Sequence, residues 1–240
     1  MKQVLLTSLL LCAAALTGCV TPQRPIHLDA GYWSHKPNSV GVVVAKMPKP
    51  GTMKAGAQGL LDIAINDAMA NPLTKHLNAL SLEDFRESGK VISAHFAKQG
   101  IPTKLIPEEL DISALPKVKD KVQDYAALDY TALKEKYGVD QLIVLEVSAA
   151  GTIRSYYGFI PTGAPQGYFS CRGSLIDLSN NKLLWTVSAV QQVPIDDPWD
   201  QEADGYPHVT SAFYRALETA KTSMVGDLVG STPAKVSSTR

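Results

Sequence analysis

A nearly unbroken apolar run, Leu142–Ile143–Val144–Leu145–Glu146–Val147, lies near the middle of the 240-residue chain. Only Glu146 interrupts it, so apolar and polar residues do not alternate along the run. A strand with this pattern is buried on both faces, as at the centre of a sheet that helices cover. The run therefore predicts an α/β domain built around a central strand.

Patterned segments on both sides of this run complete the expected domain. Before it, we expect strands at Ser39–Met47 and Ile101–Ile106, a flexible loop at Gly51–Gly59, and helices at Leu60–Met69, from Ser81 to Gly100, and at Asp129–Tyr137. After it, we expect strands at Thr152–Ile160, Gly167–Leu178 and Leu183–Val193, the last two joined as a hairpin, and a final helix at Val209–Val229. This order predicts a single α/β domain with a mixed sheet, flanking helices, a C-terminal antiparallel meander and a final helix.

The first 18 residues have the pattern of a cleaved secretory signal peptide. Lys2 is their only charged residue, and the apolar stretch from Val4 to Leu16 has 13 residues. A helix that spans a bilayer needs about 20 such residues, so this stretch is too short to remain as an anchor.

The end of this segment, Leu16–Thr17–Gly18–Cys19, resembles the lipobox of bacterial lipoproteins. The resemblance implies diacylglycerol on the Cys19 sulfur, cleavage before Cys19, and acylation of the new amino terminus with a fatty acid such as palmitate. Val20 follows in place of Asp, which in this family implies the outer membrane, with the domain facing the periplasm. The alternative is a plain signal peptide whose Cys19 has another fate.

The mature chain divides into three parts. Residues 19–38 contain three prolines and are expected to form the lipidated N-terminus and an extended tether. Residues 39–230 form the α/β envelope domain, and the small polar residues 231–240 form a disordered tail. Cys171 is left without an intramolecular partner, so we expect a small core hydrophobe, with an intermolecular disulfide as the alternative.

Two structural motifs suggest a wider family. They are Leu133–Lys134–Glu135–Lys136–Tyr137–Gly138–Val139–Asp140 before the central strand, and the hairpin Leu175–Ile176–Asp177–Leu178–Ser179–Asn180–Asn181–Lys182–Leu183–Leu184–Trp185. Both resemble small envelope domains: the amino-terminal domain of TolB, the periplasmic part of the curli-secretion lipoprotein, and uncharacterised lipoproteins of Gram-negative bacteria. The resemblance implies docking and oligomer assembly, with no shared catalytic residue.

Residue types that carry chemistry are scattered. The five histidines do not have the spacing of a zinc site, and no phosphate-binding or dinucleotide-binding glycine motif is present. With 23 basic and 23 acidic residues, the chain lacks the positive charge that nucleic-acid binding requires. We therefore expect no enzyme activity, no cofactor apart from the lipid on Cys19, and no nucleic-acid partner; a hydrolase that uses Cys171 is the least favoured alternative.

An acidic segment late in the chain is a weak candidate for a calcium site. Asp200, Glu202 and Asp204 alternate before Gly205, as at the start of a calcium-binding loop. The twelfth position of such a loop would be Ser211, where a bidentate Glu is needed, and Pro207 interrupts the second half. The alternative is a solvated loop whose negative charge stabilises the start of the final helix.

An uncharged aromatic segment is the candidate for partner binding. Residues 156–169 contain no charge and five aromatic residues, Tyr156, Tyr157, Phe159, Tyr168 and Phe169. Protein interfaces are enriched in aromatic residues and depleted of charge, whereas the alternative is that these rings fold back onto the core. We expect the partner to be another envelope protein or a second copy. A subunit of an oligomeric export or pore complex at the outer membrane is the main rival, and Pro161 and Pro165 argue against a membrane-inserting hairpin.

Overall fold

The computed structural model of the protein describes residues 23–35, 37–119 and 122–230. The predicted signal peptide, Cys19 and the predicted tail at residues 231–240 lie outside these residues. No helix within the described ranges has the length and apolar character needed to cross a membrane.

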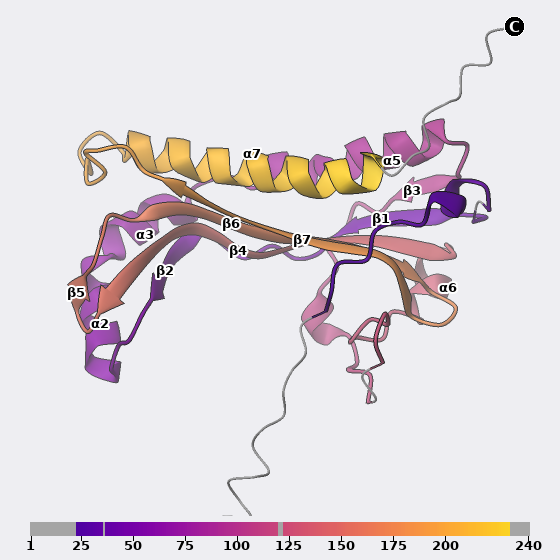
Figure 1. Cartoon of the computed structure of the whole chain (residues 1–240), viewed down its shortest axis with the longest axis horizontal. Coiled ribbons are helices and arrows are strands. Elements are labelled where there is room, and N and C mark those ends of the chain that lie inside the picture. The colour runs from indigo at the N-terminus through magenta and orange to yellow at the C-terminus, as the bar shows by residue number, and fades with distance from the viewer. Residues whose placement is uncertain (1–22, 36, 120–121, 231–240) are drawn as a thin grey trace, which may run out of the picture.

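A long, twisted mixed sheet forms the middle layer of the protein (Figure 1). Its strands have the order β3-β1-β4-β6-β7, and β2 and β5 also pair with β4. The strands are β1 (Val40–Val44), β2 (Gly51–Ala55), β3 (Thr103–Leu105), β4 (Gln141–Tyr157), β5 (Ile160–Pro161), β6 (Gln166–Asp177) and β7 (Lys182–Pro194). β1 is parallel to β3 and β4, and β2 is parallel to β4, whereas β5, β6 and β7 pair antiparallel. The mixed sheet and the C-terminal meander confirm the predicted fold class.

The central strand β4 begins with the apolar run and continues well beyond it. A register shift between Val147 and Ala149 divides it into two halves. β1 pairs with the first half and β2 with the second, so both lie on the same side of β4. The predicted loop at Gly51–Gly59 is therefore wrong over Gly51–Ala55, and the predicted strand at Thr152–Ile160 is, as far as Tyr157, the end of β4 instead of a separate strand. β4 passes through the irregularity intact, and its second half offers backbone groups with which Gly51–Ala55 pairs.

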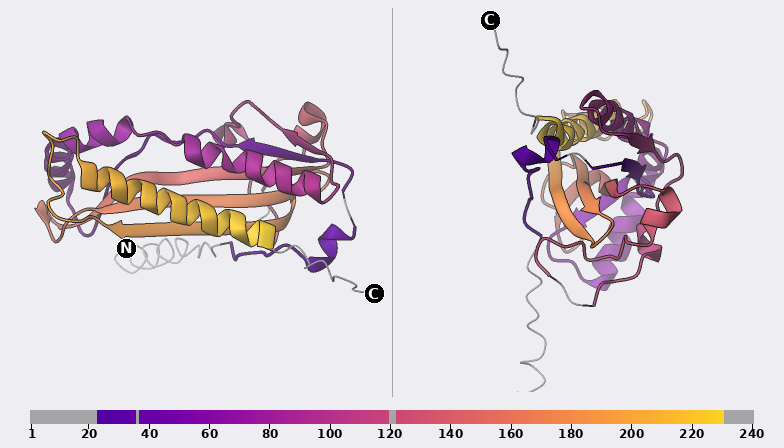
Figure 2. Two further views of the ribbon diagram at one scale, coloured as in Figure 1. Left: turned by 90° about the horizontal axis from the view of Figure 1, so that it is seen from above. Right: turned by 90° about the vertical axis from the view of Figure 1, so that its right-hand side faces the viewer.

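Helices cover the two faces of the sheet unequally. The helices are η1 (Ala30–Trp33), α2 (Leu60–Met69), α3 (Asn71–Asn78), α4 (Glu83–Arg86), α5 (Ser88–Lys98), η2 (Ile112–Ala114), α6 (Leu133–Tyr137) and α7 (Pro207–Gly230). α7 and α5 lie together on one face, and α6 packs on the other (Figures 1 and 2). Each face has its own hydrophobic cluster, one around α5 and α7 and one around α6. The apolar run Leu142–Val147 in the first half of β4 is thus covered on both sides, as its sequence predicts.

The core confirms two further predictions. Asn181 has a positive φ of 68° in the turn between β6 and β7, which forms the expected hairpin. Cys171 is fully buried in the cluster beneath α7, as predicted for a small core hydrophobe. α7 approaches β6 closely at Gly167, where a Cβ atom would lie 2.5 Å from the backbone of Ala212.

The predicted tether at residues 19–38 needs a correction. Ile26 exchanges two backbone hydrogen bonds of 2.8 Å with Thr186 on the outer edge of β7. Leu28 and Trp33 are buried in the main core, and the Trp33 ring lies 5.1 Å from that of Phe96. The segment from Ile26 to Trp33 is therefore part of the domain, because its apolar side chains gain more from burial than an extended spacer would.

Candidate functional site

Five segments meet at the end of the sheet that is farthest from α6: α2, α3, β2, the β4–β5 hairpin and the loop before α7 (Figure 1). The hairpin and α2 are joined by hydrogen bonds between residues distant in sequence. The Gly158 N–H donates to the Ala57 oxygen at 2.9 Å, and the Asn66 Nδ2 donates to the Gly158 oxygen at 3.1 Å. These bonds hold the start of α2 beside the tip of the hairpin.

Large apolar side chains are exposed where α2 and the hairpin meet. We call the following five residues the end patch, and their exposed fractions run from 53% for Phe159 to 90% for Leu60: Leu60, Leu61, Tyr157, Phe159 and Ile160. Single exposed hydrophobic residues are common on protein surfaces, but a group of them on adjacent elements marks an interaction site. The end patch is thus a candidate docking surface.

The structure divides the five aromatic residues of the predicted partner-binding segment. Tyr157 and Phe159 are exposed in the end patch, as the interface hypothesis requires. Tyr156 is half-buried and lines a neighbouring pocket, and Tyr168 is half-buried on β6. Phe169 is fully buried and packs 5.6 Å from the Phe85 ring, which corrects its prediction as a binding residue. Phe169 differs because β6 turns its side chain toward the core below α7.

Sequence reasoning missed the contribution of α2. Leu60, Leu61 and Ile63 occupy nearly successive positions, so they surround the start of the helix instead of following one stripe. Asn66 is the fully buried residue of α2, while both leucines face solvent. The signal was present in the sequence, since leucines on several faces of a short helix cannot all reach one core.

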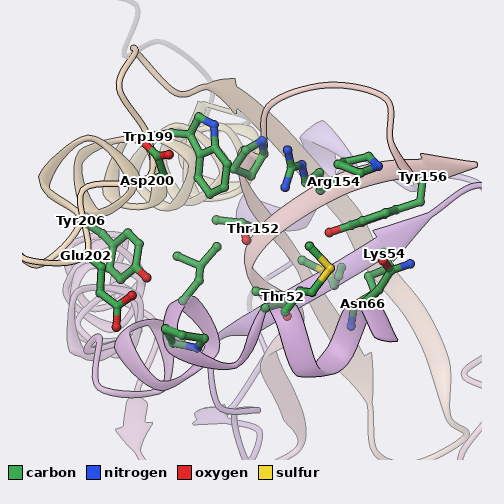
Figure 3. Close-up of a pocket in the computed structure, with 17 residues that line it drawn as sticks. Thr52, Lys54, Asn66, Thr152, Arg154, Tyr156, Trp199, Asp200, Glu202 and Tyr206 are labelled. Atoms are coloured by element: carbon green, nitrogen blue, oxygen red, sulfur yellow. The ribbon is translucent and has the colours of Figure 1, made fainter. Parts of the chain in front are cut away.

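A pocket of about 220 Å³ lies beside the end patch (Figure 3). β2, α2, α3, β4 and the loop before α7 supply its walls, which are largely apolar or aromatic. The apolar and aromatic lining consists of Met53, Met69, Ala70, Pro72, Leu73, Tyr156, Pro161, Pro165, Trp199 and Tyr206. The remaining lining residues are polar or charged: Thr52, Lys54, Asn66, Thr152, Arg154, Asp200 and Glu202.

Arg154 is held in this pocket by two aromatic rings. Its guanidinium carbon lies 4.7 Å from the centre of the Trp199 ring and 5.9 Å from that of Tyr156. Its Nε donates to the Gly163 oxygen at 2.7 Å. The ion pairs formed among the described residues do not include Arg154, whereas the nearby Lys54 is paired with Asp67. The guanidinium is therefore fixed in orientation and has donors to spare.

Asn66 places an unused acceptor at the same pocket. Its Nδ2 donates to the Gln58 Oε1 at 2.8 Å and to the Gly158 oxygen. Because the Gly158 oxygen can only accept, these contacts fix the orientation of the amide. The fully buried Oδ1 then has no hydrogen-bond partner within the described chain. An unpaired buried acceptor costs about 1–3 kcal/mol, and Asn66 Oδ1 is the one among the unpaired buried atoms of the described residues whose side chain lines this pocket.

The acidic segment does not assemble a calcium site. Asp200 and Glu202 line the pocket, whereas Asp204 is exposed and does not line it. No group of three His, Cys, Asp or Glu residues within the described ranges could hold a metal ion. The loop is tightened instead by its own backbone, with the Tyr206 N–H donating to the Gln201 oxygen at 2.9 Å.

Two potential nucleophiles are placed unfavourably for hydrolysis. Burial raises the pKa of the Cys171 thiol to about 12, so it does not form a thiolate at neutral pH. The Thr210 hydroxyl lies 2.8 Å from the Nε2 of His76 but donates its proton to the Tyr206 oxygen. His76 is then the donor to Thr210 and cannot act as its general base.

Comparisons with known proteins give a fold-level likeness. The chain matches no protein-family model, and no curated protein matches its sequence. PelC from Paraburkholderia phytofirmans, solved as a dodecamer, is 10% identical, with a TM-score of 0.35 over 89% of this chain and 100% of that one. Lipoprotein GNA1162 from Neisseria meningitidis is 19% identical, with a TM-score of 0.24 over 68% of this chain and 88% of that one.

A minor lipoprotein from Acinetobacter baumannii is 8% identical, with a TM-score of 0.26 over 80% of this chain and 93% of that one. Bacterial lipoproteins are thus among the solved structures that the chain is similar to. With TM-scores this low, the chains superpose only loosely.

Proposed function

We propose that the protein is a lipid-anchored periplasmic lipoprotein of the outer membrane that docks another envelope protein without catalysis. The lipobox resemblance at Cys19 supports the anchor. The end patch is the observation that carries the docking role, because it exposes five large apolar side chains on a rigid junction of α2 and the β4–β5 hairpin. Confinement to a membrane raises the effective concentration of the two partners, so even a small interface suffices.

Crosslinking in cells tests the docking role. Burial of one leucine and one phenylalanine contributes about 1.5–3 kcal/mol each to a complex, so a Leu61→Ser, Phe159→Ser double variant should reduce crosslinked complexes at least about tenfold. Val91→Ser is the matched control, because Val91 is similarly exposed but lies on α5 away from the patch. Complexes that persist in the double variant at the wild-type level would contradict the proposal.

The anchor has a separate test. We expect wild-type protein to fractionate with the outer membrane and to carry acyl groups detectable by mass spectrometry, and Cys19→Ala to lose both. Wild-type protein without acyl groups, together with unchanged fractionation of Cys19→Ala, would show that the anchor assignment is wrong.

The free edge of β7 favours a second candidate, assembly of several copies into an export or pore complex. The backbone N–H and C=O groups of Thr186 point away from β6, toward Ile26. Because the direction of these groups alternates along a strand, those of Ser188, Val190 and Gln192 also point away from β6. From Leu183 to Val193 the strand carries no charge that would protect this edge from pairing.

Val190→Pro removes one outward N–H without touching the ladder to β6, so it should lower the oligomer mass measured in detergent. Val190→Thr, which keeps the N–H, is the control. A discrete monomer in wild-type protein would eliminate the assembly role and leave the docking role intact.

A further inference from the structure

The pocket beside the end patch combines three features on separate elements. Arg154 on β4 offers unpaired guanidinium donors, Asn66 on α2 offers a buried unpaired acceptor, and an apolar wall that includes Met69 and Leu73 lies with them. Figure 3 shows Trp199 and Asp200 on one side of the space, with Tyr156, Lys54 and Asn66 on the other. The three features line one cavity, and a ligand in it reaches the fully buried Asn66 Oδ1 once the side chains that cover this oxygen move aside.

Each feature selects a chemical group. A planar guanidinium with free donors binds a carboxylate in a bidentate manner. An unpaired carbonyl oxygen needs an N–H or O–H donor, and an amide N–H meets this need without introducing charge. The apolar wall accepts an aliphatic or aromatic side chain.

The size of the pocket limits the ligand further. At about 220 Å³ it is smaller than the roughly 300–1,000 Å³ of pockets that enclose whole small molecules. One amino-acid residue at the end of a chain fits this scale. The remainder of the partner would then lie over the adjoining end patch.

We infer that the pocket binds the carboxyl-terminal residue of a partner polypeptide. Arg154 receives its carboxylate, the Asn66 Oδ1 accepts its amide N–H, and the apolar wall holds its large apolar side chain. Asp200 and Glu202 also line the pocket. They repel the bound carboxylate, so Arg154 has to outweigh them, and they further disfavour a partner that carries acidic residues beside its carboxyl terminus. This inference rests on the proposed docking function and names the partner chemistry.

Three small probes separate the features. N-acetyl-phenylalanine has the carboxylate, the amide N–H and the ring; its amide derivative lacks the carboxylate, and 3-phenylpropionate lacks the N–H. We expect N-acetyl-phenylalanine to bind the full chain with a Kd of about 0.5 mM, an ordinary affinity for a ligand of this size. Each of the other two should bind about tenfold more weakly, because each leaves one pocket group unpaired.

The tryptophans provide the readout in two-dimensional NMR of the full chain in detergent. The indole N–H signal of Trp199 should move during the titration, while those of the buried Trp33 and Trp185 stay in place as internal controls. Arg154→Gln should weaken binding of N-acetyl-phenylalanine about tenfold. Arg215→Gln removes a more exposed arginine on α7 and should leave binding unchanged.

The inference is overturned if the indole N–H signal of Trp199 does not move during the titration. It is also overturned if the amide derivative or 3-phenylpropionate binds as tightly as N-acetyl-phenylalanine. The Leu61→Ser, Phe159→Ser double variant distinguishes a failure of this inference from a failure of the proposed docking function. The double variant should reduce crosslinked complexes in cells at least about tenfold without changing the Kd of the small probe. If wild-type protein does not bind the probe but still forms complexes that depend on the end patch, the pocket inference is wrong and the docking role stands. If it binds the probe but forms no such complexes, the docking role is wrong and the pocket inference stands.

Discussion

Two buried asparagines, one at each end of the sheet, are used in opposite ways. Asn181 lies in the β6–β7 turn beside α6, where its Nδ2 donates to the Ala126 and Leu128 oxygens and its Oδ1 accepts from the Tyr130 N–H. Asn66 lies at the other end and leaves its Oδ1 unpaired. The polar groups of Asn181 thus hold the chain together at the turn end, while the patch end leaves one buried acceptor unpaired and exposes several apolar side chains.

The largest expected contrast is between two leucines. Leu142→Ala removes a fully buried side chain from the central strand and should lower the free energy of unfolding by about 3 kcal/mol. Leu61→Ala removes an exposed side chain of the end patch and should change it by less than about 0.5 kcal/mol. Urea unfolding measures both values. A large loss for Leu61→Ala would mean that α2 packs into the core and that the patch is structural.

The two asparagines should differ by a smaller amount. Asn181→Ala removes the hydrogen-bond partner of three backbone groups, in two buried bonds and one part-buried bond, and should cost about 2–3 kcal/mol of unfolding free energy. Asn66→Ala loses two hydrogen bonds but also removes the unpaired Oδ1, so about 1 kcal/mol is expected. Equal losses in the same urea experiment would remove the distinction between the ends. Asn180→Ala, on the exposed side of the turn, is the control and should cost less than about 1 kcal/mol.

The smallest effect concerns His76, which contacts the Tyr206 ring near the patch end. Burial lowers the pKa of His76 below its usual value, so the unfolded chain binds a proton more readily than the folded one. Stability should therefore fall as the pH decreases below about 6.5, the usual pKa of histidine. The melting temperature of His76→Asn should depend less on pH between about 7.5 and 5 than that of wild type. His35→Asn changes an exposed histidine and should keep the wild-type dependence.

The sequence predicted the regions in which local pattern and tertiary burial agree. The apolar run of β4, the Asn181 turn and the α7 stripe each need only local information, since every side chain with a strong preference finds its expected environment. β2 was missed because Gly51–Ala55 has little strand preference of its own and is ordered by pairing with β4. The packed segment from Ile26 to Trp33 differs from the predicted tether because the prolines that flank it, Pro25 and Pro37, are typical of an extended spacer, whereas Ile26, Leu28 and Trp33 between them pack on the domain.

The candidate site was harder to predict for a different reason. Tyr157 and Phe159 were identified from composition, but only tertiary structure brings Leu60 and Leu61 beside them. Arg154 and Asn66 are 88 residues apart in the sequence, and neither belongs to a recognisable sequence motif. Phe169 was misassigned because an aromatic count cannot tell which face of a strand a ring occupies.

If Cys19 carries the proposed lipid, the backbone pairing of Ile26 with Thr186 limits how far the domain can stand from the membrane. Gln23, the first described residue, lies four positions after Cys19, and four Cα–Cα steps span at most about 14 Å when the chain is fully extended. With this short linker, the domain stays close to the lipid surface, and its long sheet is confined to a thin layer beside the membrane. Partners would meet the protein by lateral diffusion within that layer. A longer linker, made by inserting Gly-Ser repeats before Gln23, would let the domain reach farther from the membrane.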